Sequence, residues 1–134
     1  MNNKKEIPDS SESSKVIDGL DALNSKSGLR VCRGSNELYM EVLSEFDREI
    51  DGIIDELQKL YDARDWENYR IKLEGLKLST RIIGANDLSR KAGEIERAAK
   101  EKWEAFIVAN HDDLKQQISA VRTDIGRLHG RSAS

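Results

Sequence analysis

A stripe of charged residues at helical spacing is the part of this 134-residue chain best suited to chemistry. Glu74 stands three residues before Lys77, a spacing at which two helical side chains meet and can form a weak ion pair. Arg70 and Arg81 extend the stripe in both directions. A carboxylate among cations can bind a partner through its charge, whereas the same stripe on an ordinary helix is a solvated face. Both interpretations stay open on the sequence alone.

A second, apolar stripe accompanies the charged one on the same segment. It consists of Ile71, Gly75, Leu78 and Ile82, spaced 4-3-4. The stripe faces away from the side expected to form the core, so it must be buried by another element or offered to a partner. A short helix near the N-terminus is one candidate cover, and a docked partner domain is the other. Both can hold for different ends of the stripe.

Two long helices are expected to position these stripes. The first runs from Tyr39 to Leu60 with apolar residues spaced 4-3-4-3-4-3, after Ser35 or Asn36 as N-cap. The loop 62–65 is short, and its last residue, Asp65, can cap the second helix. Trp66, Tyr69, Leu73, Leu76, Thr80 and Ile83 form the buried side of that helix, and Gly84 is placed to end it.

Two further helices complete the expected fold. The third is expected to begin after Asn86 as N-cap and to continue through Trp103 to Phe106, and the fourth to run from about Asn110 to Leu128. Short loops make consecutive helices antiparallel. The sequence therefore predicts an all-α fold, an antiparallel up-down-up-down four-helix bundle with a short N-terminal helix.

The N-terminal part divides by composition. Residues 1–15 are polar and rich in serine, which predicts a disordered leader or linker. We expect a short helix at 16–23 and a loop at 24–34. The domain is expected to span 16–130, with a tail at 131–134.

Composition excludes several classes of function. The net charge is −3 with both signs interspersed, so nothing indicates binding to nucleic acid or to an anionic membrane. No apolar run approaches a membrane span, and no signal-peptide core stands at the N-terminus. The single cysteine, Cys32, excludes an internal disulfide and fits a reducing compartment. We expect a cytoplasmic protein that is not an enzyme and uses no cofactor.

The segment 73–85 resembles the signature helix of histidine-containing phosphotransfer (HPt) domains, the shuttle modules of two-component phosphorelays. The family motif runs roughly His-x-Leu-Lys-Gly/Ser-x-x-x-x-Ile-Gly-Ala, and Leu76, Lys77, Ile83, Gly84 and Ala85 are in register with it. Glu74 occupies the phosphoacceptor position, and Leu78 stands where the family has a small residue. Further blocks resemble the family at 17–20, 28–39, 65–69 and 88–99, so the similarity covers about 17–125.

The resemblance implies a module that docks a response-regulator receiver domain or a histidine kinase. Glutamate is a poor phosphoacceptor because its carboxylate is anionic near pH 7 and an acyl phosphate hydrolyses readily. The expectation is therefore a pseudo-HPt domain that binds without accepting phosphate. Whether Glu74 partly mimics the charge of a phosphohistidine stays open on the sequence. A phosphocarrier with a non-standard acceptor and an unrelated helical scaffold are the alternatives. The expected partner-binding residues are Arg70, Ile71, Glu74, Gly75, Lys77, Leu78, Arg81 and Ile82.

The remaining candidate residues have ordinary structural explanations. Cys32 is expected to be a small packed residue rather than a nucleophile. His111, at the start of the last helix, and His129, near the C-terminus, show no spacing typical of metal ligands, so no metal site is expected. Both histidines are expected to lie far from Glu74. Trp66 and Trp103 fall on core stripes.

Overall fold

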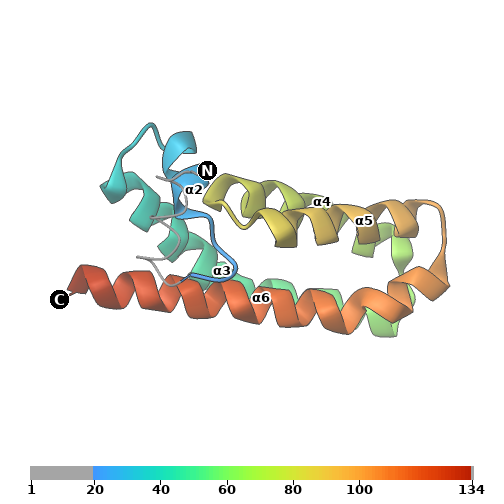
Figure 1. Ribbon diagram of the computed structural model, residues 1–134. Helices are drawn as coiled ribbons and strands as arrows, with labels where there is room; N and C mark the ends of the chain where they lie inside the picture. The colour runs from blue at the N-terminus through green and yellow to red at the C-terminus, as the bar shows by residue number, and fades with distance from the viewer. Residues whose placement is uncertain (1–19, 134) are drawn as a thin grey trace, which may run out of the picture.

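The computed structural model describes residues 20–133, and every regular element in this range is an α-helix (Figure 1). The helices are α2 (Ser25–Val31), α3 (Asn36–Asp62), α4 (Trp66–Ile83), α5 (Asn86–Lys100) and α6 (Glu104–Ala133). The leader expected at 1–15 lies outside the described residues. Part of the tail expected at 131–134 continues α6, which ends at Ala133. None of the described helices is long and apolar enough to cross a membrane.

Several helix ends follow the local signals in the sequence. The Ser35 side chain accepts a hydrogen bond from the amide of Leu38 at the start of α3, and Asp65 does the same for α4. Gly84 ends α4 in the left-handed conformation with φ of 89°. The prediction that Asn86 caps α5 was wrong. The N-cap position belongs to Ala85, which makes no side-chain cap bond, and Asn86 is already the first helical residue.

The expected boundary between the last two helices was also wrong. α5 ends at Lys100, and α6 begins at Glu104, well before Asn110. The turn between them contains Lys102 with φ of 58°, and neither glycine nor proline announces it. The apolar spacing continues through the turn, which is why one helix to Phe106 was expected. Trp103 consequently lies outside the core, with 55% of its surface exposed.

The N-terminal part of the described chain differs from expectation as well. The segment 24–34, expected as a loop, contains α2, which Asn24 caps by accepting a hydrogen bond from the amide of Ser27. Residues 20–23 are not helical and include bends at 21 and 22, and the rest of the short helix expected at 16–23 lies outside the described residues. Leu20 and Leu23 are nevertheless buried. Cys32, which follows α2, is buried too, as expected for a packed residue.

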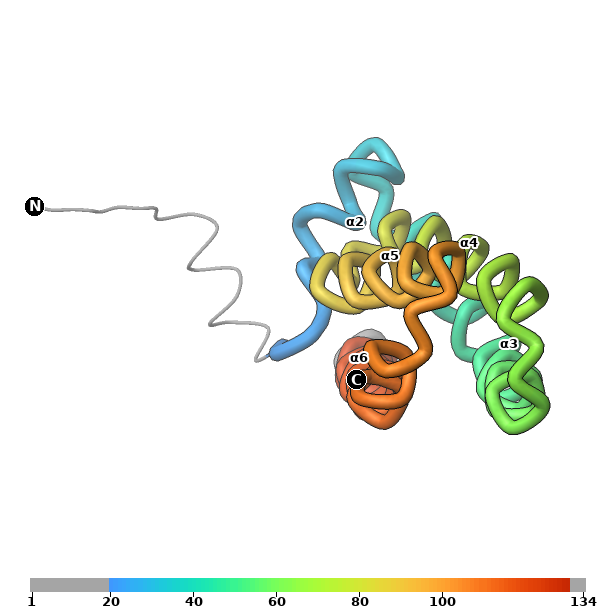
Figure 2. The backbone as a smooth tube through the Cα atoms, turned by 90° about the vertical axis from the view of Figure 1, so that its right-hand side faces the viewer, coloured from blue at the N-terminus to red at the C-terminus, as the bar shows by residue number. Residues whose placement is uncertain are grey.

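The four long helices pack side by side around one core. α3 contacts α4 and α6, and α5 contacts the same two helices, so each long helix has two principal neighbours. The most extensive contact joins α4 to α5, which lie together on one side in the end view of Figure 2. The buried side chains at the centre include Leu43, Ile50, Leu57, Leu73, Leu76, Ile83, Leu88, Ile95, Ile107, Leu114, Ile118 and Ile125. The periodicities thus identified the buried faces of α3, α4 and α6 correctly, and that of α5 as far as Ala99.

Candidate functional site: the outer face of α4

The outer face of α4, which we define as Ile71, Glu74, Gly75, Leu78, Arg81 and Ile82, is open. About half of each large apolar side chain is exposed: 51% for Ile71, 49% for Leu78 and 43% for Ile82. The opposite side of the helix is fully buried through Tyr69, Leu73 and Leu76. At Gly75, a Cβ atom would meet no atom within 4 Å, so the backbone itself is accessible there.

The expected cover for this face is not provided by the described part of the N-terminal segment. Leu20 and Leu23 are buried in the core, and the backbone between them is bonded to Asp124 of α6. Val16 and Ile17, the other apolar residues expected to form that cover, lie outside the described residues. The three apolar side chains of the outer face remain half exposed.

Lys77 does not pair with Glu74, contrary to the expectation from their spacing. Its ammonium lies 2.9 Å from Oε1 of Glu96 on α5, in an ion pair whose two side chains are largely buried. The Lys77 stem crosses α5 at Gly93, where a Cβ would come within 3.1 Å of it. The backbone oxygen of Lys77 also accepts a hydrogen bond from the Ser89 hydroxyl. Lys77 therefore holds α4 against α5.

The other charged residues of the stripe separate into two kinds. Arg70 lies 2.6 Å from Oε2 of Glu67, and this hydrogen bond raises the pKa of the Arg70 guanidinium and lowers the pKa of the Glu67 carboxyl. Glu74 and Arg81 are exposed, and within the described part of the chain neither takes part in an ion pair. The expected continuous stripe is thus two engaged cations, Arg70 and Lys77, beside two charges that remain available to a partner.

His111 belongs to a buried cluster that the sequence did not reveal. Tyr69 of α4 places its hydroxyl 2.7 Å from Nδ1 of His111 on α6, and the Tyr61 ring of α3 stacks on the imidazole at 3.8 Å. Gln58 Oε1 lies 3.1 Å from Nε2 of His111 and also accepts a hydrogen bond from Lys115. The cluster joins three helices. Its members come from three separate stretches of the chain, 58–61, 69 and 111–115, so no local signal could have identified it.

The hydrogen bonds define the protonation of His111. Gln58 donates its amide nitrogen to Asp62, so its oxygen is the atom that faces His111. Nε2–H of the imidazole therefore donates to Gln58, and Nδ1 accepts from the Tyr69 hydroxyl. Burial, followed by the charge of Lys115, lowers the pKa of His111, while burial raises the pKa of Tyr69. His111 is a neutral structural residue with both ring nitrogens occupied.

His129 lies on another side of the protein. Its Nε2 is 3.2 Å from the Ser44 hydroxyl, so it belongs to the contact between α6 and α3. Neither histidine is on the outer face of α4. Among the described residues no group of three or more histidine, cysteine or acidic side chains is arranged to hold a metal ion.

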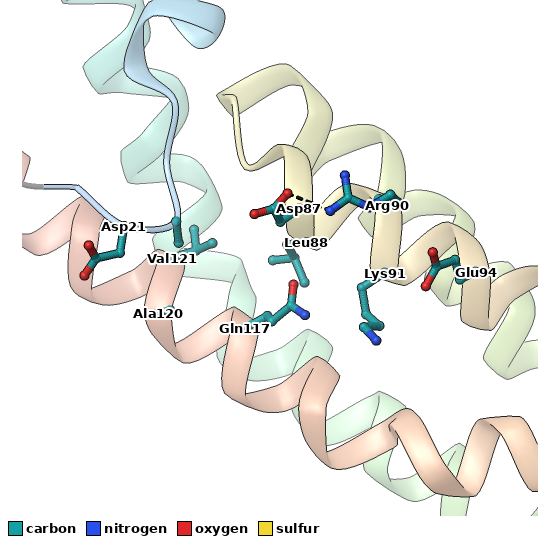
Figure 3. Close-up of a pocket in the computed structure, with 10 residues that line it drawn as sticks. Asp21, Asp87, Leu88, Arg90, Lys91, Glu94, Gln117, Ala120 and Val121 are labelled. Atoms are coloured by element: carbon teal, nitrogen blue, oxygen red, sulfur yellow. Dashed lines mark hydrogen bonds and ion pairs between the residues drawn. The ribbon is translucent and has the colours of Figure 1, made fainter. Parts of the chain in front are cut away.

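A cleft between α5, α6 and the segment that carries Asp21 is one of several concave features in the described part of the chain (Figure 3). Lys91 spans it, with its ammonium 2.9 Å from Oδ1 of Asn110 and 3.1 Å from Oδ2 of Asp113. Gln117 points its Oε1 into buried space without a hydrogen-bond partner. The cleft combines both charges and no nucleophile, so it offers no evident chemistry.

Comparison of the chain with protein-family models, with curated proteins and with solved structures found no match. The geometry of the outer face of α4 is therefore the basis for any functional conclusion.

Proposed function

We propose that this protein is an HPt-like signalling module that binds a response-regulator receiver domain, or a histidine kinase, without accepting phosphate. The proposal presumes the antiparallel up-down-up-down order of the four long helices and a cytoplasmic location, where such partners reside. The observation that carries it is the outer face of α4. Half-exposed Ile71, Leu78 and Ile82 accompany Glu74, which stands where the resemblance expects a histidine.

The chemistry of this face favours binding over transfer. The exposed carboxylate of Glu74 repels an incoming phosphoryl group, and the ammonium of Lys77 is engaged by Glu96. A phosphocarrier would need another acceptor. His111 is only 2% exposed, and both of its nitrogens are hydrogen-bonded. These contacts favour a pseudo-HPt domain over a carrier that uses His111.

Two measurements test the proposal. The first is a titration of the protein with receiver domains encoded in the same genome, with the heat of binding measured by calorimetry. We expect Leu78→Glu to weaken binding by about tenfold or more, because a charge placed in a desolvated contact costs more than about 1 kcal/mol. Val108→Glu on α6 is the matched control, since Val108 is 46% exposed and lies on another helix. Equal effects of both variants, or no binding to any receiver, would leave only a scaffold role.

The second measurement is incubation with a receiver that carries a radiolabelled aspartyl phosphate. No label is expected to appear on this protein. Stable label would refute binding without transfer and identify a phosphocarrier. Peptide mapping of that label would then locate the acceptor.

A further inference from the structure

The outer face of α4 has a pattern that is complementary to itself. Ile71 and Ile82 stand at its two ends, with Gly75 and Leu78 between them at equal distances from the midpoint. Gly75 leaves the backbone open, whereas Leu78 projects with 49% of its surface exposed. If a second α4 lies antiparallel across a twofold axis at this midpoint, Ile71 meets Ile82 of the other copy, and Leu78 fills the space above its Gly75.

The charges of the face fit the same arrangement. In an antiparallel helix pair related by such an axis, each flank of one helix lies beside the same flank of the other. Glu74 and Arg81 share one flank, and neither has an ion pair within the described chain. At 1.5 Å of rise per residue, Glu74 of one copy and Arg81 of the other are offset by about 3 Å along the helix axis, which is close enough for an ion pair. The twofold axis creates two such Glu74–Arg81 pairs.

We propose that the outer face of α4 binds a second copy of this chain as an antiparallel, twofold-symmetric helix pair. The contact consists of one exposed helix per protomer, which makes it small, and small interfaces are weak and reversible. A receiver and a second copy would use the same residues and exclude each other. Self-association would thereby control how much of the docking face is free at a given protein concentration.

Sedimentation equilibrium over a concentration series tests the pairing without any receiver. We expect a reversible monomer–dimer equilibrium. Glu74→Arg and Arg81→Glu should each weaken it by about fivefold, because two exposed ion pairs are lost at once. The double variant Glu74→Arg/Arg81→Glu should restore the affinity to about the original value. Glu41→Arg on α3 makes the same charge change as Glu74→Arg at an exposed site on another helix, and it should have no effect.

Gly75→Leu tests the apolar part of the contact. Because a Cβ at Gly75 meets nothing within 4 Å, the variant should fold normally. Its side chain would occupy the space needed by Leu78 of the second copy, so dimerisation should be lost. A protein that stays monomeric at millimolar concentration overturns the proposal. So does a dimer that is indifferent to Gly75→Leu, or one that the charge swap fails to restore. Receiver binding is measured separately, so either conclusion can fail without the other.

Discussion

Asp124 is the residue whose replacement should reveal most about how the N-terminal segment is held. It lies on α6 with 1% of its surface exposed. Its Oδ2 accepts three backbone hydrogen bonds, from Asp21 at 3.0 Å, Ala22 at 2.6 Å and Leu23 at 2.9 Å. A carboxylate acceptor makes each such bond worth about 1.5–3 kcal/mol. Only the bond to Leu23 is fully buried. The bonds to Asp21 and Ala22 are partly exposed, so their amides can bond to water when the carboxylate is removed.

The structure limits how much stability the protein can lose when Asp124 is replaced. We expect Asp124→Ala to lower the free energy of unfolding by about 3 kcal/mol, and Asp124→Asn by about half of that, since an amide oxygen accepts the same bonds without the charge. The loss should not exceed about 4 kcal/mol, because burial of Leu20 and Leu23 contributes roughly 2 kcal/mol each. At a larger loss, the segment 20–23 should detach while the rest of the protein stays folded.

Urea denaturation and amide hydrogen exchange together check this prediction. In Asp124→Ala the amides of 21–23 should lose protection, while the amides in the middle of α3 and α6 should keep theirs relative to global stability. Asp112→Asn is the control, because Asp112 is an exposed aspartate on the same helix. A stability change below about 0.5 kcal/mol, with protection at 21–23 unaltered, would refute the role assigned to Asp124.

Three further predictions concern the packing of α4 and the buried histidine. Gly84→Ala should lower the free energy of unfolding, measured by urea denaturation, by several kcal/mol, because φ is 89° and the new Cβ would clash with the backbone oxygen of Asn24. Gly75→Ala, at an open helical position, should instead raise it by up to about 1 kcal/mol, and the reverse order would contradict the geometry. The pKa of His111 is lowered by burial, so the unfolded chain binds more protons near the ordinary histidine pKa of about 6.5. The stability contributed by neutral His111 should therefore be fully present well above that pH and should fall as the pH drops through about 6.5. His111→Asn should flatten this dependence, and an unchanged slope would exclude His111 as its source. A double-mutant cycle of Lys77→Met and Glu96→Gln should give a coupling of about 1 kcal/mol, because the pair is largely buried, and zero coupling would mean that it contributes nothing.

How far the sequence predicts this fold can be judged from individual residues. The repeat from Tyr39 to Leu60 and the repeat of α4 identified which sides of those helices are buried, because a 3.6-residue period places such residues on one face. Ser35, Asp65 and Gly84 marked helix ends because capping is a local interaction between neighbouring residues. The same periodicity placed Ile71, Leu78 and Ile82 on the side of α4 that faces away from the core, but it left open whether another element covers them.

Other features depended on contacts between distant parts of the chain. Lys77 had a suitable partner three residues away, yet Glu96 on α5 offers a drier site, so the nonlocal pair forms instead. The turn after α5 carries no glycine or proline. The amides of Lys102 and Trp103 donate to the carbonyls of Ala99 and Ala98 there, and α6 then packs against α5. The cluster of Tyr69 and His111 joins residues far apart in sequence, and so do the hydrogen bonds that the amides of 21–23 donate to Asp124.

The sequence by itself determined the helical class and which side of α4 faces away from the core, since these follow from local periodicity and capping. Only the tertiary structure decided which charges remain available. Packing of α4 against α5 removes Lys77 from the charged stripe and leaves Glu74 and Arg81 without ion-pair partners in the described chain. The physical reason is that ion pairs depend on distance in space and on exposure to water, neither of which sequence separation specifies.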